Sequence, residues 1–279
     1  MSALRDDVDP EGLLEFSVVF SDRSLNSMSA VFGDVMRDIS RILKQAYNAD
    51  SMAVVPGGGT YGMEAIARQF ASNKSALIIR NGWFSYRWSQ ILDAGDIAKT
   101  QTIIKASQLS DEPTSPFAPA SLEKIKAEIT KQKPDIVFCP HVETSAGIVV
   151  PDSFIKQVSD AVHEVGGLFV LDCVASGTLF VDMQATGVDV LLTAPQKGWS
   201  ASPCAAAVMM SARGREILNT TKSSSFANDL KKWTEIMEIY ESGKHAYHAT
   251  MPADSLRLFR DALIETESFG LEAIKNAQI

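Results

Sequence analysis

Two charged side chains, a carboxylate and an amine, follow apolar segments of the kind that form buried strands, where they could act on a bound ligand. Asp172 comes directly after the apolar run 168–171, and Lys197 follows the run 188–192 within the segment TAPQKGWS. Taken singly, a strand-end carboxylate is most often a structural hydrogen-bond acceptor, and a lysine is most often solvated. At the ends of two strands of one sheet, however, they can meet one ligand. The amine can react with a carbonyl group, and the carboxylate can hold a proton on a ring nitrogen.

A glycine-rich turn, VVPGGGTYG, follows the apolar run 52–55 and precedes a helical pattern. Glycines at such a place let backbone N–H groups face a phosphate at a helix N-terminus. Gly57, Gly59 and Gly62 also satisfy the spacing G-x-G-x-x-G of dinucleotide sites, which requires a carboxylate at the end of the next strand. That strand ends at Arg80 and Asn81, so a site for a phosphorylated dinucleotide is a weaker alternative. A tight turn that binds nothing is the other.

The phosphate cradle, the carboxylate and the amine occur in this order along the chain, and pyridoxal phosphate requires these three parts. The segment HVETSAGIVVPD follows another apolar run, 135–139, and places Thr144 where it can hydrogen-bond a ring oxygen. An ordinary strand-end loop is the other interpretation of this segment. No metal site is expected, because the chain has no CxxC or HExxH and its four histidines lack a ligand spacing.

The composition limits the class of protein. The 279 residues are 46% hydrophobic and 22% charged, which is typical of a globular protein with a sizeable core. The net charge of -8 argues against broad contacts with nucleic acid or anionic membranes. Three cysteines lie far apart in apolar runs and are expected to be buried thiols. Without a signal core or a bilayer-spanning apolar run, the chain is expected to be cytoplasmic.

Apolar periodicity predicts the elements that must position these residues. Helices are predicted at 27–47, 63–71, 83–92, 122–131, 154–165, 226–241 and 254–267. Strands are predicted at 52–55, 76–79, 102–104, 135–139, 168–171, 188–192 and 205–210. This alternation predicts a three-layer α/β fold, with helices on both faces of a mostly parallel sheet. Ligands of such sheets bind at the carboxyl ends of the strands, so the three parts of the site would meet there.

Together, these segments resemble class V of the pyridoxal-phosphate-dependent aminotransferases, and within it the alanine–glyoxylate and serine–pyruvate transaminases. The matching segments are PGGGTYGMEA, RNGWFSYRW, HVETSAGIVVPD, FVLDCVASG, VDVLLTAPQKGW and YHATMP, and the resemblance runs from about Val31 onward. It implies the large domain of a fold type I transferase. It also implies transamination between a small amino acid, of the alanine or serine type, and a 2-oxo acid such as glyoxylate or pyruvate.

The resemblance implies a role for each matched residue. Lys197 would hold the cofactor covalently and then move protons, and Asp172 would pair with the pyridine nitrogen. Val174 would pack on one face of the ring. Phe84 would stack on the other face, with Trp83 as the alternative.

Further matched residues would bind the cofactor's oxygen atoms. Thr144 would hydrogen-bond the phenolic oxygen. Tyr247 and Thr250 match residues that reach the phosphate of a neighbouring subunit, which implies a homodimer with shared sites. Read from their local pattern alone, Tyr247 is a buried aromatic and Thr250 a helix N-cap. The phosphate ligands within the same chain would be Gly58, Gly59, Thr60 and Gln196.

Three regions are expected: an N-terminal arm at 1–22, a large cofactor-binding domain at 23–265, and the start of a C-terminal domain at 266–279. The chain ends within a helical pattern, so the family's small C-terminal domain, which carries the arginine for the substrate carboxylate, is expected to be missing. A lyase or cysteine desulfurase is an alternative, but Gln196 replaces the histidine that usually precedes the lysine in desulfurases. A nicotinamide-dependent oxidoreductase leaves Asp172 and Lys197 unexplained. A non-catalytic protein on the same scaffold is the last alternative.

Overall fold

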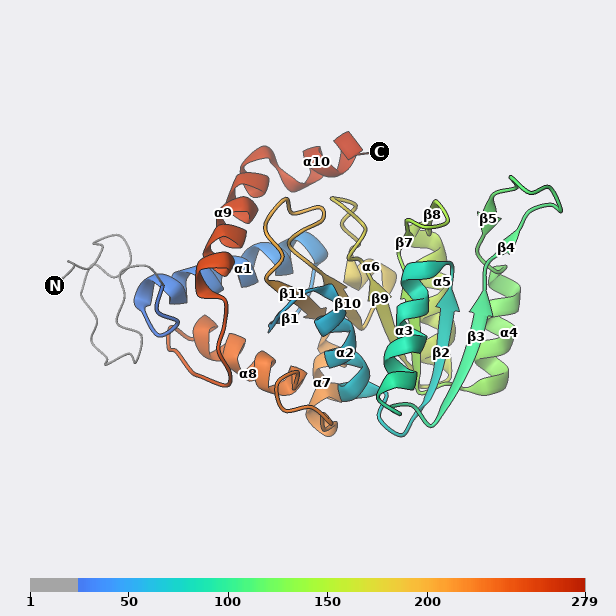
Figure 1. Ribbon diagram of the computed structural model, residues 1–279, viewed down its shortest axis with the longest axis horizontal. Coiled ribbons are helices and arrows are strands. Elements are labelled where there is room, and N and C mark those ends of the chain that lie inside the picture. The colour runs from blue at the N-terminus through green and yellow to red at the C-terminus, as the bar shows by residue number, and fades with distance from the viewer. Residues whose placement is uncertain (1–24, 279) are drawn as a thin grey trace.

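The computed structural model describes residues 25–278 and is built on one seven-stranded sheet (Figure 1). The strands are β1 (Ser51–Pro56), β2 (Ser75–Arg80), β3 (Thr100–Lys105), β6 (Ile136–Pro140), β9 (Leu168–Asp172), β10 (Val190–Thr193) and β11 (Ala205–Met210). Their order across the sheet is β1-β11-β10-β9-β6-β2-β3. Strand β11 is antiparallel to both neighbours, and the other paired strands are parallel, so the predicted mostly parallel sheet is confirmed.

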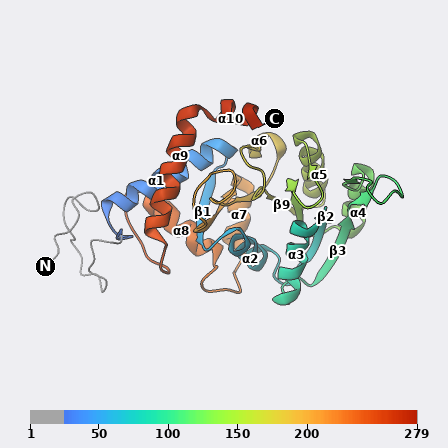
Figure 2. The same cartoon turned by 45° about the horizontal axis from the view of Figure 1, so that its top comes forward.

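Helices cover both faces of this sheet. The helices of the described residues are α1 (Ala30–Tyr47), α2 (Gly59–Phe70), α3 (Trp83–Ala94), α4 (Leu122–Gln132), α5 (Asp152–Glu164), α6 (Met183–Thr186), α7 (Ala212–Thr220), α8 (Leu230–Glu241), α9 (Ala253–Phe269) and α10 (Leu271–Gln278), of which α9 packs on α1 and α10 on α9. Helices α2 and α3 contact each other on one face, while α4, α5 and α6 form the layer on the other (Figures 1 and 2). The predicted three-layer α/β architecture is therefore confirmed.

Each predicted helix and strand corresponds to an observed element, but several short elements were not predicted. Helices α6 and α7 are among them, whereas α10 matches the helical pattern expected at the end of the chain. Two small hairpins are as well: β4 (Ser107–Gln108) with β5 (Phe117–Ala118), and β7 (Val142–Glu143) with β8 (Ile148–Val149). Two-residue strands and a four-residue helix are too short to show an apolar period.

The sheet is buried on both sides, which explains its sequence pattern. Strands β6 and β11 are buried along their whole length, so they read as continuous apolar runs instead of alternating ones. Helix α2 packs closely on β11. The contact is so close that a Cβ atom at Gly62 would collide with Ala206. This close packing places the N-terminus of α2 at the carboxyl end of β1.

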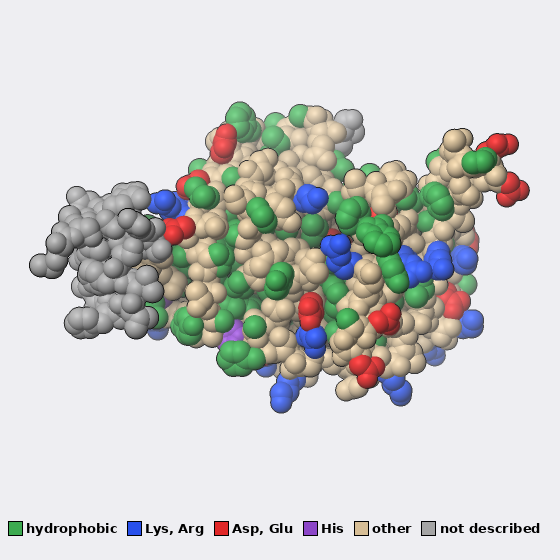
Figure 3. All heavy atoms as spheres, viewed as in Figure 1, with side chains coloured by type: hydrophobic (Ala, Val, Ile, Leu, Met, Phe, Trp, Pro, Cys, Tyr) green, Lys and Arg blue, Asp and Glu red, His purple; other side chains and the backbone are tan. Residues whose placement is uncertain are grey.

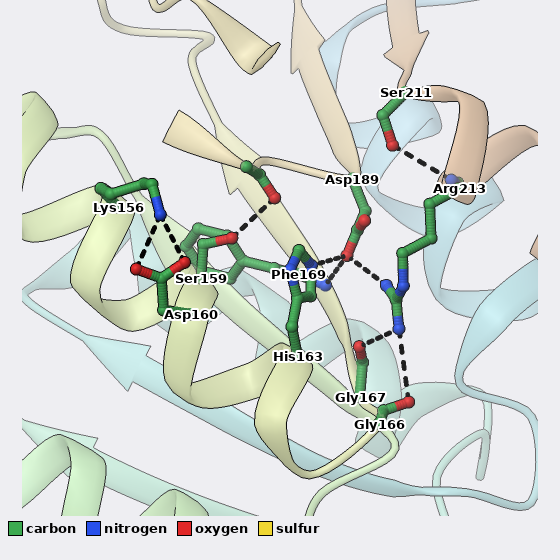
Figure 4. Close-up of polar contacts among 12 residues, drawn as sticks. Lys156, Ser159, Asp160, His163, Gly166, Gly167, Phe169, Asp189, Ser211 and Arg213 are labelled. Atoms are coloured by element: carbon green, nitrogen blue, oxygen red, sulfur yellow. Dashed lines mark hydrogen bonds and ion pairs between the residues drawn. The ribbon is translucent and has the colours of Figure 1, made fainter. Parts of the chain in front are cut away.

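A polar network connects several elements at the amino end of strand β10 (Figure 4). Asp189 precedes β10 and is 1% exposed. Its carboxylate accepts hydrogen bonds from the Arg213 guanidinium at 2.7 Å, the Phe169 N–H at 2.8 Å and the His163 ring at 2.9 Å. Arg213 also donates to the Gly167 carbonyl at 2.7 Å. The network ties α5, α7, β9 and β10 together at the end of the sheet far from the strand ends that carry Asp172 and Lys197.

The terminal regions bear on the predicted division of the chain. The predicted arm, residues 1–22, lies outside the described residues. The predicted boundary after residue 265 falls inside α9, and this division stays a prediction. Helix α10 packs back on the chain that follows β9, where the Gln278 side chain donates to the Ser176 carbonyl at 3.1 Å. Within residues 25–278, no helix is both long and apolar enough to span a membrane.

Candidate functional site

A cavity of about 250 Å³ opens at the carboxyl edge of the sheet, where β6, β9 and β10 end and α2 and α3 begin. Residues from five separate segments of the chain line it. Those predicted from the sequence are Gly59, Thr60, Phe84, Thr144, Asp172, Val174, Gln196 and Lys197. The fold thus brings most of the predicted site residues to one place. Gly58 is not part of the lining but directly precedes it, as the N-cap of α2.

Asp172 is the last residue of β9, and its Oδ1 accepts a hydrogen bond from the Val174 N–H at 3.0 Å. Burial, together with the negative charge of Glu143, raises the pKa of the Asp172 carboxyl from its ordinary 3.8 to about 6. The Val174 N–H and the positive charge of Arg87 act in the opposite direction. Asp172 forms no ion pair with any residue from 25 to 278. The site therefore contains a carboxylate that a cationic group would stabilise.

Lys197 lies in the turn after β10, faces the cavity and has no carboxylate partner in the described part of the chain. The two residues after Lys197 pack closely against other parts of the chain. A Cβ atom at Gly198 would collide with the backbone of Gly177, so the lysine turn packs on the loop that follows Asp172. Trp199 is 1% exposed and stacks on Phe180 at 5.0 Å between ring centroids. A rigid support thus carries an exposed, unpaired amine.

The part of the cavity formed by the N-terminus of α2 can bind an anion. The first N–H groups of α2, at Gly59 and Thr60, have no acceptor within the helix. A Cβ atom at Gly59 would lie 3.0 Å from Val174, so glycine allows the helix to approach that residue. The Thr60 hydroxyl accepts a hydrogen bond from Arg87 at 3.1 Å, and the buried Gln196 Oε1 has no partner among the described residues.

Arg87 was not predicted as a site residue, although it lies in the quoted segment RNGWFSYRW. It lines the cavity from α3, three residues after Phe84, so that one helix face carries both side chains. The i, i+3 spacing from Phe84 could have identified Arg87 as a site residue from the sequence. Of the two aromatic candidates, Phe84 lines the cavity and Trp83 does not.

Glu143 was also not predicted, and it fixes the first turn of α3. It is fully buried. Its carboxylate accepts hydrogen bonds from the N–H groups of Phe84 at 3.1 Å and Ser85 at 2.8 Å, and from the hydroxyls of Ser85 at 2.7 Å and Ser145 at 2.6 Å. Burial alone would raise the pKa of Glu143, but these hydrogen bonds outweigh it and the pKa is lowered. The carboxylate also complements the positive N-terminus of α3.

We expect Glu143→Gln to destabilise the protein by about 1.5–3 kcal/mol, because an amide NH₂ would face groups that are themselves donors. Since the pKa of Glu143 is lowered, its contribution to stability is present above its ordinary pKa and is lost as the pH falls through the folded-state value. The difference between wild type and variant should therefore shrink on acidification. Urea unfolding at neutral and acidic pH measures this. The exposed Glu164→Gln serves as the control, and an equal loss in both variants would contradict the assignment.

Tyr247 and Thr250 lie in the segment between α8 and α9, and neither lines the cavity. The Tyr247 side chain is 62% exposed, and its hydroxyl is 3.4 Å from the Thr250 hydroxyl. The N-cap of α9 is Pro252. The interpretation as a buried aromatic and a helix N-cap is therefore wrong. The two hydroxyls form a pair on the surface.

The three cysteines are free and buried, as predicted. Burial raises the pKa of the Cys204 thiol to about 11 and shifts those of Cys139 and Cys173 upward as well. A thiolate nucleophile is thus disfavoured at each of these positions. Residues 25–278 contain no group of three or more His, Cys, Asp or Glu side chains arranged to hold a metal ion.

Known proteins resemble this chain in sequence and fold. Alanine–glyoxylate aminotransferase 1 of Saccharomyces cerevisiae is 29% identical over 254 residues, which cover 87% of this chain and 63% of that protein. The small subunit of a soluble hydrogenase from a Synechococcus species is 27% identical over 253 residues, covering 88% and 61%. The crystal structure of an alanine–glyoxylate aminotransferase from a Nostoc species matches with a TM-score of 0.76 at 27% identity, covering 90% of this chain and 63% of that one.

The chain thus spans less than two thirds of the length of these relatives. The family model described as aminotransferase class-V matches residues 16–278, which is nearly the whole chain. The fold, the strand-end cavity and this match agree with the resemblance seen in the sequence. The chain belongs to the class V aminotransferases, a family of pyridoxal-phosphate-dependent enzymes.

Proposed function

We propose that the chain takes part in transamination between a small amino acid, of the alanine or serine type, and a 2-oxo acid such as glyoxylate or pyruvate. The observation that carries the proposal is the common cavity lined by Asp172 and Lys197 beside the N-terminus of α2. The alanine–glyoxylate aminotransferases among the relatives support the choice of substrates. The substrates are small molecules, and no nucleic acid or membrane is part of the proposal.

The residues of the cavity are suited to pyridoxal phosphate. The Asp172 carboxylate has a raised pKa and forms no ion pair within residues 25–278, which suits a protonated ring nitrogen. The Thr60 hydroxyl, the free N–H groups of α2 and the NH₂ group of the Gln196 side chain supply donors for a phosphate at this cavity. Arg87 adds a positive charge at that wall. We assign these residues to binding of the cofactor. Gly58 and Gly59, which have no side chains, would let the phosphate come close to the backbone at the N-terminus of α2.

When bound, the cofactor supplies an electron sink for a carbanion at the substrate's α-carbon. The side chains then divide the remaining work. Lys197 Nζ would hold the cofactor covalently until the substrate amine displaces it, and the released amine would then accept and return the α-proton. Asp172 keeps the ring nitrogen protonated, and Thr144 binds the phenolic oxygen. Phe84 and Val174 hold the ring from its two faces.

The alternatives receive less support. A desulfurase mechanism requires a reactive cysteine, whereas the three cysteines of this chain are buried and have raised pKa values. The match to class V aminotransferases provides no basis for a nicotinamide cofactor at Gly57, Gly59 and Gly62.

The proposal is tested by single-turnover assays. Protein loaded with pyridoxal phosphate is mixed separately with alanine, serine, glycine, aspartate and cysteine, and the change in cofactor absorbance is followed. Alanine or serine should convert the cofactor to its amine form and release the corresponding 2-oxo acid, and glyoxylate or pyruvate should reverse the change. Release of sulfide from cysteine without conversion by alanine or serine would overturn the proposal.

We also propose a homodimer in which Tyr247 and Thr250 bind the phosphate held by the partner subunit. Support comes from the exposed pair of hydroxyls, which do not line the cavity at Lys197 of their own chain. Hydrogen bonds to a charged group contribute about 1.5–3 kcal/mol each, so cofactor binding should strengthen dimerisation.

Mixed dimers test the shared site. Chains with Lys197→Ala are combined with chains carrying both Tyr247→Phe and Thr250→Ala, and cofactor affinity and turnover are measured. One site of the mixed dimer would then contain Lys197 together with intact hydroxyls from the Lys197→Ala subunit, so it should regain normal affinity. If the mixture shows only the weakened affinity of the double variant, the two residues act within their own subunit.

A further inference from the structure

A second hollow, of about 280 Å³, lies at the carboxyl ends of β2 and β3, and it shares no lining residue with the cavity at Lys197. Its walls include the charged side chains of Arg80 and Lys105 and the aromatic side chains of Trp83, Tyr86 and Phe117. We refer to it as the Arg80–Lys105 hollow. Helix α3 separates the two sites, with Phe84 and Arg87 on one face and Trp83 and Tyr86 on the neighbouring one.

The two cations stand side by side. Arg80 and Lys105 are the last residues of β2 and β3 and are paired in the parallel register. Side chains at paired positions point to the same face of a sheet, and like charges placed so repel each other. Neither residue forms an ion pair with a carboxylate between residues 25 and 278. In a chain with a net charge of -8, this uncompensated pair provides a place for an anion.

Aromatic rings continue the wall beside the cations. The Arg80 guanidinium lies 4.6 Å from the centre of the Tyr86 ring, and Tyr86 meets the Trp83 ring edge-on at 6.1 Å. Trp83 is 63% exposed and Phe117 is 46% exposed, so both leave a large apolar surface in water. Figure 3 shows Lys and Arg side chains gathered next to apolar ones below the β4–β5 hairpin. A planar ring would cover this exposed aromatic surface.

We propose that the Arg80–Lys105 hollow binds a small organic dianion in which a planar ring carries a phosphate group, as in a nucleoside monophosphate. The phosphate lies between Arg80 and Lys105, where its two negative charges neutralise the two positive ones. The ring stacks on Trp83. The proposal does not depend on the function assigned to the cavity at Lys197.

Adenosine monophosphate is the probe, titrated into the purified protein at low salt and followed by calorimetry and tryptophan fluorescence. Trp83 is exposed, whereas the other tryptophans are at most 2% exposed, so quenching reports on Trp83. A Kd on the order of 1 mM or tighter is expected. Lys105→Gln should raise this Kd about tenfold, since a charge-assisted contact to phosphate is lost. Adenosine should not bind, and inorganic phosphate should bind more weakly than the nucleotide.

Lys99→Gln is the matched control, because Lys99 is exposed and lies just before the amino end of β3, so the same change in net charge occurs at the far edge of the same strand. Trp83→Phe should abolish the quenching while calorimetry still detects binding. A nucleotide bound in the cavity at Lys197 would not respond to Lys105→Gln. The proposal is overturned if the nucleotide does not bind, if phosphate alone binds equally well, or if Lys99→Gln weakens binding as much as Lys105→Gln.

Discussion

Replacing Lys197 with alanine is expected to abolish turnover and covalent attachment of the cofactor while leaving the fold intact. The loss of the amine removes both the covalent link and the group that moves the α-proton. General acid–base catalysis alone contributes about 10²–10⁴-fold, so the total loss should reach at least about 10⁴-fold. Because the Lys197 side chain is exposed and has no ion-pair partner among residues 25–278, unfolding stability should change by less than about 0.5 kcal/mol.

Absorbance of the cofactor, turnover with alanine and urea unfolding are measured on the same preparation. Lys222→Ala is the control, since it removes an exposed lysine elsewhere on the surface and should affect none of the three. Turnover within tenfold of wild type in Lys197→Ala would contradict the assigned role. A large loss of stability would mean instead that the lysine turn needs the side chain for folding.

Asp172→Asn is expected to slow turnover and at the same time stabilise the cofactor-free protein. The pKa of Asp172 is raised from 3.8 to about 6, so the folded state binds the proton more tightly than the unfolded chain. Folding stability from this group therefore falls as the pH rises from about 4 to 6. At 1.36 kcal/mol per pKa unit, the carboxylate costs up to about 3 kcal/mol at neutral pH. Asparagine retains the oxygen that accepts the Val174 N–H and removes the charge.

With cofactor bound, the same substitution removes the group that keeps the ring nitrogen protonated. A drop in turnover of about 10³-fold, or roughly 4 kcal/mol in the barrier, is expected. Denaturant unfolding of the cofactor-free wild type and variant is compared at pH 4 and pH 7, where the gain should be small and large respectively. Normal turnover, or a cofactor-free variant less stable than wild type at pH 7, would contradict the account.

The layered fold was predictable because its strands are buried on both faces. Strands such as β6 and β11 are continuous apolar runs between turn residues, so their positions follow from the sequence alone. The antiparallel direction of β11 was not predictable, because direction depends on how the chain returns to the sheet and not on the composition of the strand.

The site residues that could be predicted from the sequence are those whose side-chain type and position after an apolar run indicate a chemical role. Asp172 directly follows one apolar run, Lys197 lies in the turn after another, and the fold brings them into one cavity. Glu143 was overlooked because its role arises from hydrogen bonds with Phe84 and Ser85. These residues lie nearly 60 positions earlier in the chain, so no local pattern shows the contact. The choice between Trp83 and Phe84 depended on the rotation of α3 about its axis, which its tertiary packing sets.

We propose that Lys197 is the residue that carries the cofactor, and borohydride reduction identifies this residue. The protein is loaded with pyridoxal phosphate, reduced to make the covalent bond permanent, digested and analysed by peptide mass spectrometry. The pyridoxyl label is expected on the peptide that contains Lys197. Stoichiometric labelling of a different lysine, or no labelling of a protein that still performs transamination, would contradict it.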